Sequence, residues 1–490
     1  MVNPILRRRL KQRRSIPLQY VVIIGSLFII VMYAVGLYLI VGESTQANQD
    51  SKSLNQSIRK GSKNIQIHSN QKQDQPEENA IVKTAVATIG WAVTITGCGA
   101  DPITEGAAVL KHAVHLTSIH GNQGGKYDYK MYAIYHPDGE MCALTLKDLG
   151  YELVKRETPV AVKDIEGKWL REKIEKNGCC GEKELVKLEA YTLTQHPAIV
   201  HLDLDVVVLK PMDHLFDMIL SDSLENFDTS NVPIMWPEQP IPQKVNAFFT
   251  RDCKFFMNWD QCLFFNFVMV HFLTYYASLL FYTDNMVGPK RKYKPVQGGF
   301  LVLRPSMDSY NEFVKVIKKG IEKEGGGWGE PPEVVGPFYG YMTFQGLIPY
   351  FYDVLHKNEG VELNRCVYNQ MADNPKDKRT VNDITHGRCR TDQDECEDCR
   401  SRPIEEVVSA HFTLCQKPWL CQAQDHDIIQ QRLCRKLHHE WHRIRSDMEQ
   451  SWGREAVGDG SYQKDHFFGH CTKHGKAGYL PIAKPYGHVN

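Results

Sequence analysis

The sequence lacks an excess of charge of either sign. Lys and Arg number 58 among its 490 residues, as do Asp and Glu, so the formal net charge is zero. Proteins that bind nucleic acid normally carry a basic face, whereas the densest basic stretch here is confined to the N-terminus. We therefore expect no nucleic-acid partner. The sequence also lacks an internal repeat, and its hydrophobic fraction of 42% is that of an ordinary globular protein.

Charged residues are absent from residues 21–41, which read VVIIGSLFIIVMYAVGLYLIV. At about 1.5 Å per residue, a helix of this length spans a hydrocarbon core of about 30 Å. Six basic residues lie at positions 7–14, and positive charge stays on the cytoplasmic side. We predict a signal anchor preceded by a cytoplasmic tail at 1–20, as in a single-pass type II protein of the Golgi or ER membrane with a luminal catalytic domain. A buried core helix is the alternative.

Phe, Tyr and Trp are absent from residues 42–85, which are rich in Gln, Ser, Asn and Lys. Such a segment cannot bury enough apolar surface to order itself. We therefore expect a flexible luminal stem. It carries the only N-x-S/T sequon of the chain, Asn55-Gln56-Ser57, which is compatible with glycosylation in the lumen.

Cysteine pairs with zinc-site spacing are scarce. Cys396 and Cys399 form a C-x-x-C pair, but no second pair matches it, so a zinc knuckle is the weaker interpretation. Of the 14 cysteines, many crowd into the C-terminal third, among them Cys366, Cys389, Cys396, Cys399, Cys415, Cys421 and Cys434. In an oxidising lumen this cluster predicts disulfides, whose connectivity the sequence leaves open. We expect His438, His439 and His442 to lie on a face of an amphipathic helix rather than to bind a metal.

Strand-like and helix-like segments alternate from Trp91 onwards. Segments 91–97, 129–135, 151–160, 198–205 and 298–306 predict strands, and segments 107–116, 182–193 and 308–319 predict helices. This alternation is typical of an α/β domain with a largely parallel central sheet flanked by helices. We assign residues 86–424 to the domain and residues 425–490 to a C-terminal helix followed by a Gly-, His- and Lys-rich tail.

The most informative segment for chemistry is AIVHLDLDVVV, residues 198–208. Asp203 and Asp205 lie at the carboxyl end of a buried strand, where open α/β sheets bind ligands. On an extended strand residues i and i+2 project to the same face, so both carboxylates could hold one divalent cation and leave room for phosphate oxygens. A nucleotide-sugar transferase needs such a cation to neutralise its diphosphate leaving group. Taken alone, a D-x-D also occurs by chance on solvated loops.

Three motifs give the chain a family resemblance. ELVKLEAYTLTQHPAIVHLDLDVVVLKPMDHLFD, GGFLVLRPSMDSYNEFVKVI and HFTLCQKPW occur in this order. They resemble the Lys-Leu helix with D-x-D strand, the Gly-Val-Phe strand and the closing His-x-x-Gly-x-x-Lys-Pro-Trp motif of glycosyltransferase family 8, the glycogenin-like nucleotide-diphospho-sugar transferases. The resemblance covers about residues 90–420. It implies a Rossmann-like GT-A fold and a retaining transfer of a hexose-type sugar from a nucleotide sugar, expected to be a UDP-sugar, to a glycan or glycoprotein acceptor.

The resemblance also implies roles for single residues. Asp203, Asp205 and His411 would bind Mn²⁺ or Mg²⁺, with Asp203 also near the ribose of the nucleotide sugar. A nitrogen ligand beside carboxylates suits Mn²⁺ better than Ca²⁺. Lys417 would hold the diphosphate as a point charge. Lys187 would reach the phosphate and sugar of the donor, with an ordinary exposed helix lysine as the alternative.

Further contacts with the donor are implied around these residues. Thr96 lies where the family contacts uridine, although a simple strand-end residue is the alternative. Gln297 and Gly298 would bind the nucleotide sugar, and Gln345 would lie beside the anomeric carbon. Two departures put the identity of the sugar in doubt: Gln297 replaces an asparagine of the family, and Phe344 stands where relatives have the aspartate of Asp-Gln-Gly.

Two other functions compete with glycosyl transfer. The D-x-D strand also resembles the nucleophile strand of haloacid-dehalogenase phosphatases, in which the first aspartate attacks phosphorus. That strand normally opens its domain, whereas here a long α/β segment precedes it. A catalytically inactive luminal binding protein of the same fold is the second alternative, because the Asp-Gln-Gly aspartate is missing.

Residues 254–283 form an apolar aromatic stretch that does not suit the rest of the domain. A second membrane span would place the strands at 198–205 and 298–306 on opposite sides of the membrane. A buried helical insertion would have to satisfy Asn266 and His271. The third interpretation is a retained intron, because codons for Cys253-Lys254 and Thr283-Asp284 can contain splice-donor and splice-acceptor sequences. Excision would preserve the reading frame and join Asp252 to Asn285 through one tyrosine.

Overall fold

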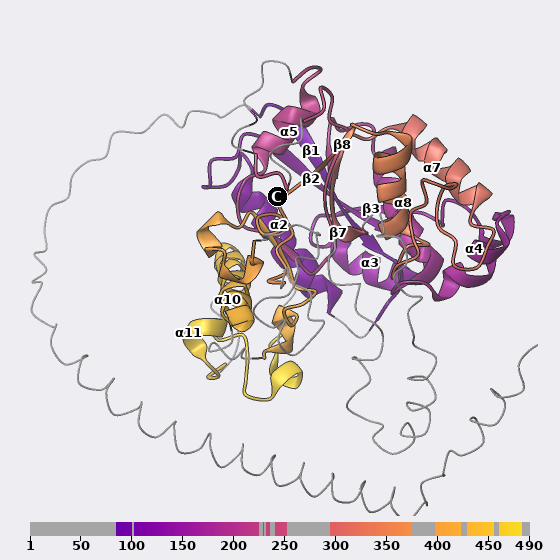
Figure 1. Cartoon of the computed structure of the whole chain (residues 1–490). Helices are drawn as coiled ribbons and strands as arrows, with labels where there is room; N and C mark the ends of the chain where they lie inside the picture. Colours follow the sequence, from indigo (N-terminus) through magenta and orange to yellow (C-terminus); the bar gives the residue numbers. More distant parts are fainter. Residues whose placement is uncertain are drawn as a thin grey trace, which may run out of the picture. The chain divides into compact units, whose positions relative to one another are not determined.

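The computed structural model describes residues 85–99, 102–224, 229, 232–235, 241–251, 295–373, 397–422, 429–454 and 460–482. They all belong to one compact unit, Val82–Asn490. A seven-stranded sheet in the order β3-β2-β1-β4-β7-β6-β8 forms its centre (Figure 1). The strands are β1 (Thr88–Ile95), β2 (Asp128–Tyr135), β3 (Glu152–Lys155), β4 (Ile199–Leu202), β6 (Ala247–Arg251), β7 (Val296–Leu303) and β8 (Gly360–Glu362).

The sheet is mostly parallel, as predicted. β1 pairs in parallel with β2 and β4, and β3 with β2. β7 runs antiparallel to both of its neighbours, β4 and β6, and β8 is again parallel to β6. Only β7 is therefore reversed among the seven strands. Every residue of β4 and β7 is buried, as expected for strands covered on both faces.

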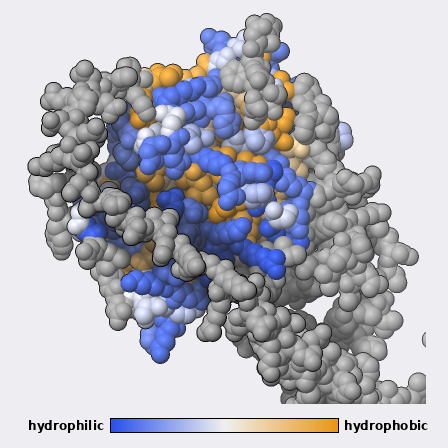
Figure 2. All heavy atoms as spheres, turned by 90° about the vertical axis from the view of Figure 1, so that its left-hand side faces the viewer, coloured by the Kyte–Doolittle hydropathy of each residue, from blue (hydrophilic) through white to orange (hydrophobic). Residues whose placement is uncertain are grey.

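Helices cover both faces of the sheet and bury two separate cores. Trp91 faces the first core and Ala92 the second, because successive side chains of a strand point to opposite faces. The first core includes α2 (Ile103–Thr117), α3 (Glu140–Lys147), α5 (Asp213–Leu220) and α10 (Ile429–Ser451). The second includes α4 (Lys168–Lys173), the 3-10 helix η6 (Gly181–Thr192), α7 (Met307–Lys319) and α8 (Phe344–Tyr350). The face on the side of α10 is largely hydrophilic, with hydrophobic residues exposed among the hydrophilic ones (Figure 2).

The helix at 308–319 shows why local sequence fixes an element well. Ser306 caps the first turn of α7 by accepting a hydrogen bond from the amide of Ser309 at 3.2 Å. The helix ends at Gly320, whose φ of 71° few other residues adopt readily. Phe313 and Ile317, four residues apart, pack into the second core. The predicted helix at 182–193 is present as η6.

Two of the expectations from the sequence need correction, one for the D-x-D segment and one for the C-terminal tail. Asp203 and Asp205 do not lie on an extended strand: β4 ends at Leu202, and residues 203–205 form a turn before β5 (Val206–Val208). β5 leaves the main sheet and pairs antiparallel with β9 (Ser409–His411). Residues 460–482 are not a loose tail, because they contain α11 (Lys464–Phe467) and bury Phe467 and Cys471 completely.

Disulfides staple the C-terminal part of the domain, as the cysteine cluster predicted. Cys366 pairs with Cys399, Cys415 with Cys434, and Cys421 with Cys471; an additional pair joins Cys98 to Cys142. The Cys366–Cys399 bond rules out Cys399 as a zinc ligand. His438 and His442 lie buried in α10, which agrees with the predicted helix face.

Three of the predicted segments lie outside the described residues, so their assignments stay predictions. These are the membrane anchor at 21–41, the stem at 42–85 except for its last residue, and the segment 254–283. No helix within the described ranges combines the length and hydropathy needed to cross a membrane. The segment 252–294 connects two neighbouring strands, since Arg251 of β6 lies opposite Val296 of β7 in the ladder.

Candidate functional site

The main chain brings the D-x-D turn and the closing motif together. The amide of Asp203 donates to the carbonyl of Gly299 at 3.1 Å, and the amide of Val206 closes the turn on the carbonyl of Asp203 at 3.2 Å. In the small sheet Val206 lies opposite His411, and the amide of Phe412 donates to the carbonyl of Asp205 at 2.9 Å. Residues 200 positions apart in the chain are therefore placed by backbone hydrogen bonds rather than by flexible side chains.

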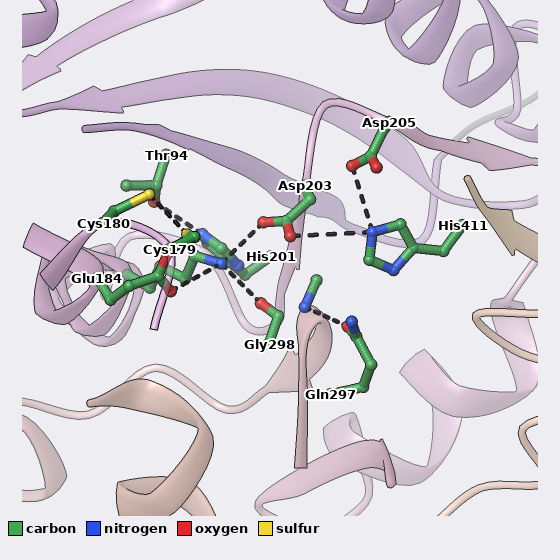
Figure 3. Close-up of polar contacts among 12 residues, drawn as sticks. Thr94, Cys179, Cys180, Glu184, His201, Asp203, Asp205, Gln297, Gly298 and His411 are labelled. Atoms are coloured by element: carbon green, nitrogen blue, oxygen red, sulfur yellow. Dashed lines mark hydrogen bonds and ion pairs between the residues drawn. The ribbon is translucent and has the colours of Figure 1, made fainter. Parts of the chain in front are cut away.

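The side chains of Asp203, Asp205 and His411 converge at the carboxyl end of β4 (Figure 3). His411 Nε2 lies 3.2 Å from Oδ1 of Asp205 and 4.0 Å from Oδ2 of Asp203. The ligand atoms of the three residues all lie within 4.8 Å of one another. Gly299 leaves room for them, because an added β-carbon would lie 2.8 Å from Oδ2 of Asp203. One imidazole nitrogen and two carboxylates fit a divalent metal such as Mn²⁺.

Two lysines balance the two carboxylates. Lys187 Nζ lies 2.9 Å from Oδ1 of Asp203, and Lys417 makes an ion pair with Asp205. Lys187 is nearly buried, and its ammonium also donates to the carbonyl of Gly298 at 3.1 Å and lies 3.3 Å from Glu184. The site thus holds negative charge for a cation and positive charge for a phosphate side by side.

Electrostatics keep both members of the Lys187–Asp203 pair ionised. Burial by itself would lower the pKa of Lys187, but the carboxylates of Asp203 and Glu184 raise it well above the usual value. Desolvation would raise the pKa of Asp203, but the positive charges of Lys187 and His411 together hold it below its usual value. Asp203 is therefore a carboxylate, the form that binds a cation, at neutral pH.

Gln345 and Gly298 lie next to this group. Gln345 is the second residue of α8. A β-carbon added to Gly298 would lie 3.4 Å from Cγ of Gln345 and 3.6 Å from Nζ of Lys187. Phe344 is completely buried, with its ring 6.0 Å from that of His201 and its ring centroid 5.9 Å from Lys187 Nζ. An apolar ring therefore lies beside Lys187 at the position where the family resemblance implies an aspartate.

Thr96 and Gln297 do not join the Asp–Asp–His group. Gln297 is buried, and its Oε1 accepts from the amide of Gly299 at 2.6 Å, so its side chain shapes the β7 backbone. Thr96 directly follows β1 and is hydrogen-bonded to Cys180. Their roles in donor binding stay predictions.

Sequence reasoning missed two polar residues of the site. Glu184 precedes Lys187 by three positions on η6, a spacing that places both on one helix face. His201 lies on β4, two positions before Asp203, and its Nε2 lies 2.8 Å from Thr94 Oγ1. Burial and then the charge of Lys187 lower the pKa of His201 to about 3, so this imidazole is neutral.

The C-terminal elements hold the loop that carries Lys417. Disulfides from Cys415 and Cys421 lie on either side of Lys417 and tie the loop to α10 and to the 460–482 segment. Between them His438 is hydrogen-bonded to the carbonyl of Gln416, and His442 to that of Pro418. Lys417 is therefore positioned by residues that come after it in the chain.

No protein-family model matches the chain, and no curated protein matches it. Among solved structures it is similar to apo mouse xyloside xylosyltransferase 1, with 12% identity, a TM-score of 0.34 and coverage of 68% of this chain and 99% of that chain. The glycosyltransferase GlyE of Streptococcus pneumoniae TIGR4 is 11% identical with a TM-score of 0.34, and the match covers 75% of this chain and 64% of that chain. The galactosyltransferase LgtC in complex with donor and acceptor sugar analogues is 12% identical with a TM-score of 0.30, and the match covers 73% of this chain and 99% of that chain. At these TM-scores the activity of this chain has to be argued from its own site.

Proposed function

We propose that the protein is a metal-dependent, retaining glycosyltransferase of family 8 that moves a hexose-type sugar from a UDP-sugar to a glycan or glycoprotein acceptor in the secretory pathway. The observation that carries the proposal is the convergence of Asp203, Asp205 and His411 with two lysines at the carboxyl end of a mostly parallel sheet. We further propose that residues 21–41 anchor it as a type II protein in the Golgi or ER membrane.

The metal site would be formed by Asp203, Asp205 and His411. When bound, Mn²⁺ or Mg²⁺ supplies positive charge next to the diphosphate of the donor. Hydrogen bonds to the backbone of β7 and β9 hold the two aspartates in place before the donor arrives. Such preorganisation is what makes fixed charges effective in a partly water-excluded site.

The two lysines would bind the leaving group. Lys417 is one-third exposed and already lies against a carboxylate, so it could exchange Asp205 for an oxygen of the donor diphosphate. Lys187 is nearly buried between Asp203 and Gly298, where it would meet the sugar-bearing phosphate. Thr96 would contact the uridine, and Gln297 and Gly298 would line the sugar side.

In the proposed transfer the acceptor hydroxyl attacks the anomeric carbon from the face that the diphosphate leaves. The hydroxyl proton passes to the departing phosphate oxygen, so no separate base is required. Gln345, beside Gly298 and Lys187, would hold the sugar ring near its anomeric carbon. Configuration is retained because bond formation and bond breaking occur on one face.

Mn²⁺-dependent hydrolysis of a panel of nucleotide sugars by the full-length protein tests this function. We expect turnover of a UDP-sugar that stops when EDTA removes the metal. Binding of UDP without hydrolysis or transfer of any donor would favour the inactive binding protein, an alternative suggested by Phe344 in place of an aspartate. Hydrolysis of a simple phosphate monoester instead would favour a phosphatase and overturn the proposal.

A further inference from the structure

Two adjacent cysteines lie beside the donor site and have no part in the proposed reaction. The sulfurs of Cys179 and Cys180 are 2.6 Å apart, and Cys179 is exposed while Cys180 is half-buried. Both are thiols, whereas eight other cysteines of the described ranges form disulfides. A reagent from solution can therefore reach this pair.

The pair is connected to the donor site through a row of polar contacts (Figure 3). Cys179 donates its S–H to Oε1 of Glu184 at 2.8 Å. The other carboxylate oxygen of Glu184 lies 3.3 Å from Lys187 Nζ, which donates to Asp203 at 2.9 Å. A change at the Cys179 thiol therefore reaches Lys187 through a single buried carboxylate.

A metal site at the cysteines is the less suitable interpretation, although Cys179, Cys180 and Glu184 also lie within 4.8 Å of one another. Two sulfurs on one tetrahedral Zn²⁺, with bonds of about 2.3 Å, would be roughly 3.7 Å apart. The 2.6 Å separation of these sulfurs is much shorter.

We propose that Cys179 and Cys180 are a modification site for low-molecular-weight disulfides such as oxidised glutathione, which convert them into a ring disulfide, and that the ring weakens donor binding by drawing Lys187 towards Glu184. The second part rests on the proposed function. The first part concerns only the two thiols and is independent of it.

The exchange is balanced without a further co-reactant. The Cys180 thiolate attacks one sulfur of the oxidised glutathione and displaces the first glutathione thiolate. The Cys179 sulfur then attacks Sγ of Cys180 and displaces the second. Two cysteine thiols are oxidised to one disulfide, one glutathione disulfide is reduced to two thiols, and the two cysteine protons go to the departing thiolates. The neighbouring Cys179 and Thr96 side chains lower the pKa of Cys180, which favours its thiolate as the attacking group.

Ring closure changes the surroundings of Glu184. The oxidised Cys179 has no S–H, so Oε1 of Glu184 loses its donor. The carboxylate is then less stabilised and interacts more strongly with the remaining cation, Lys187. An ammonium held by Glu184 is less available to Asp203 and to a donor phosphate.

Peptide mass spectrometry decides the first part. The full-length protein is equilibrated in glutathione buffers of increasing oxidised fraction, and remaining thiols are alkylated. We expect the peptide with Cys179 and Cys180 to change from doubly alkylated to two hydrogens lighter, while the Cys415–Cys434 and Cys421–Cys471 bonds stay intact. Two alkylated thiols at the oxidising end, or a stable glutathione adduct in place of the ring, would overturn the modification site.

UDP binding in the presence of Mn²⁺ decides the second part. We expect the ring form to bind UDP roughly threefold to tenfold more weakly than the dithiol, the scale of one hydrogen bond. Two matched variants separate the ring from the lost donor. In the reducing buffer Cys179→Ser keeps a hydroxyl donor for Glu184 and should bind UDP like the dithiol. In the same buffer Cys179→Ala lacks the donor and should bind UDP like the ring form.

The failure of this inference differs from a failure of the proposed function. Equal UDP affinity of the dithiol, the ring form and Cys179→Ala would overturn the connection to Lys187 while leaving the donor site intact. If UDP does not bind in either redox state, the proposed function is wrong and the second part falls with it. Mass spectrometry still decides the first part in that case.

Discussion

Gly299 lies so close to His411 that a β-carbon on it would be 3.0 Å from Nδ1 of the imidazole. The same carbon would also crowd Oδ2 of Asp203. This glycine is therefore required by space, because the backbone of β7 passes directly beneath the two side chains that would hold the metal.

Gly299→Ala should weaken Mn²⁺ binding about 10- to 100-fold, the usual range for residues that position metal ligands. Calorimetric titration of the full-length protein with MnCl₂ measures the change, and the apparent Tm checks the fold. Gly97→Ala is the control, since no atom lies within 4 Å of its added β-carbon. Equal Mn²⁺ affinities for the two variants would contradict the proposed position of the metal.

Asp205→Asn should abolish metal-dependent UDP binding with little change in the apparent Tm, because the side chain lies in a turn at the edge of the site. The loss should exceed the ~10- to 100-fold typical of residues outside the ligand set. Asp203→Asn should behave similarly and His411→Ala more mildly. Retention of wild-type Mn²⁺ dependence by all three variants would refute the ligand assignment.

Lys417→Met should weaken UDP binding by about 1.5–3 kcal/mol, the scale of hydrogen bonds to charged groups, while leaving uridine binding nearly unchanged. The reason is that the ammonium would contact phosphate and not the base. Lys473→Met, at an exposed lysine of the same C-terminal region, serves as the control. Equal losses for UDP and uridine would show that Lys417 does not contact the diphosphate.

Stability should decrease as the pH falls from about 6.5 towards 4, because buried histidines stay neutral in the folded protein. Burial lowers the pKa of His438 from 6.5 to about 4, so in this range the unfolded chain binds a proton that the folded chain does not. One such residue contributes a loss of about 2 kcal/mol between pH 7 and pH 5.

His438→Gln should therefore show a shallower fall in stability over this pH range than the wild type. Thermal unfolding followed by tryptophan fluorescence at pH 5, 6 and 7 measures it. His439→Gln, on the solvent side of the same helix, should keep the wild-type slope. A slope unchanged in His438→Gln would mean that His438 does not contribute to acid sensitivity.

A chain in which residues 253–284 are replaced by one tyrosine should fold with a similar apparent Tm and bind UDP at least as well as the full-length chain. Arg251 and Val296 already face each other in the β6–β7 ladder, so the shortened connection has only to close a hairpin. Sequencing of transcripts across this junction provides a separate check. If active cells contain only the longer transcript and the shortened protein does not fold, the retained-intron hypothesis is wrong.

The elements that could be predicted are those whose own residues determine them. The strand predicted at 298–306 is apolar up to Leu303, where β7 ends, and the helix at 308–319 has its capping serine and its terminal glycine in the sequence. The turn at 203–205 could not be predicted, because LDLDVVV reads as one strand. The strand ends at Leu202 because the amide of Asp203 donates to the carbonyl of Gly299 and because Val206 pairs with β9. Both partners are far away in the sequence.

The order of residues 460–482 could not be predicted either, because it also depends on partners far away in the sequence. The composition of this segment, rich in Gly, His and Lys, is that of a disordered segment. Its order comes from partners elsewhere, chiefly Glu105, which accepts hydrogen bonds from the Tyr479 hydroxyl at 2.6 Å and the Ile482 amide at 3.0 Å. The motifs pointed to the residues proposed here to bind metal and phosphate, and Glu184 even opens the first motif, but its contacts with Cys179 and Lys187 needed the structure.

The disulfide from Cys421 to Cys471 has a consequence for the order in which the protein matures. A ribosome releases the chain from its N-terminus, so Asp203, Asp205 and His411 leave it before the segment that fixes the Lys417 loop. A nascent chain that ends before Cys471 carries the complete set of proposed ligands but a Lys417 loop that is not yet tied. If the proposed function holds, donor binding would be the last property the protein acquires, and prematurely terminated chains would not compete with the finished protein for nucleotide sugar.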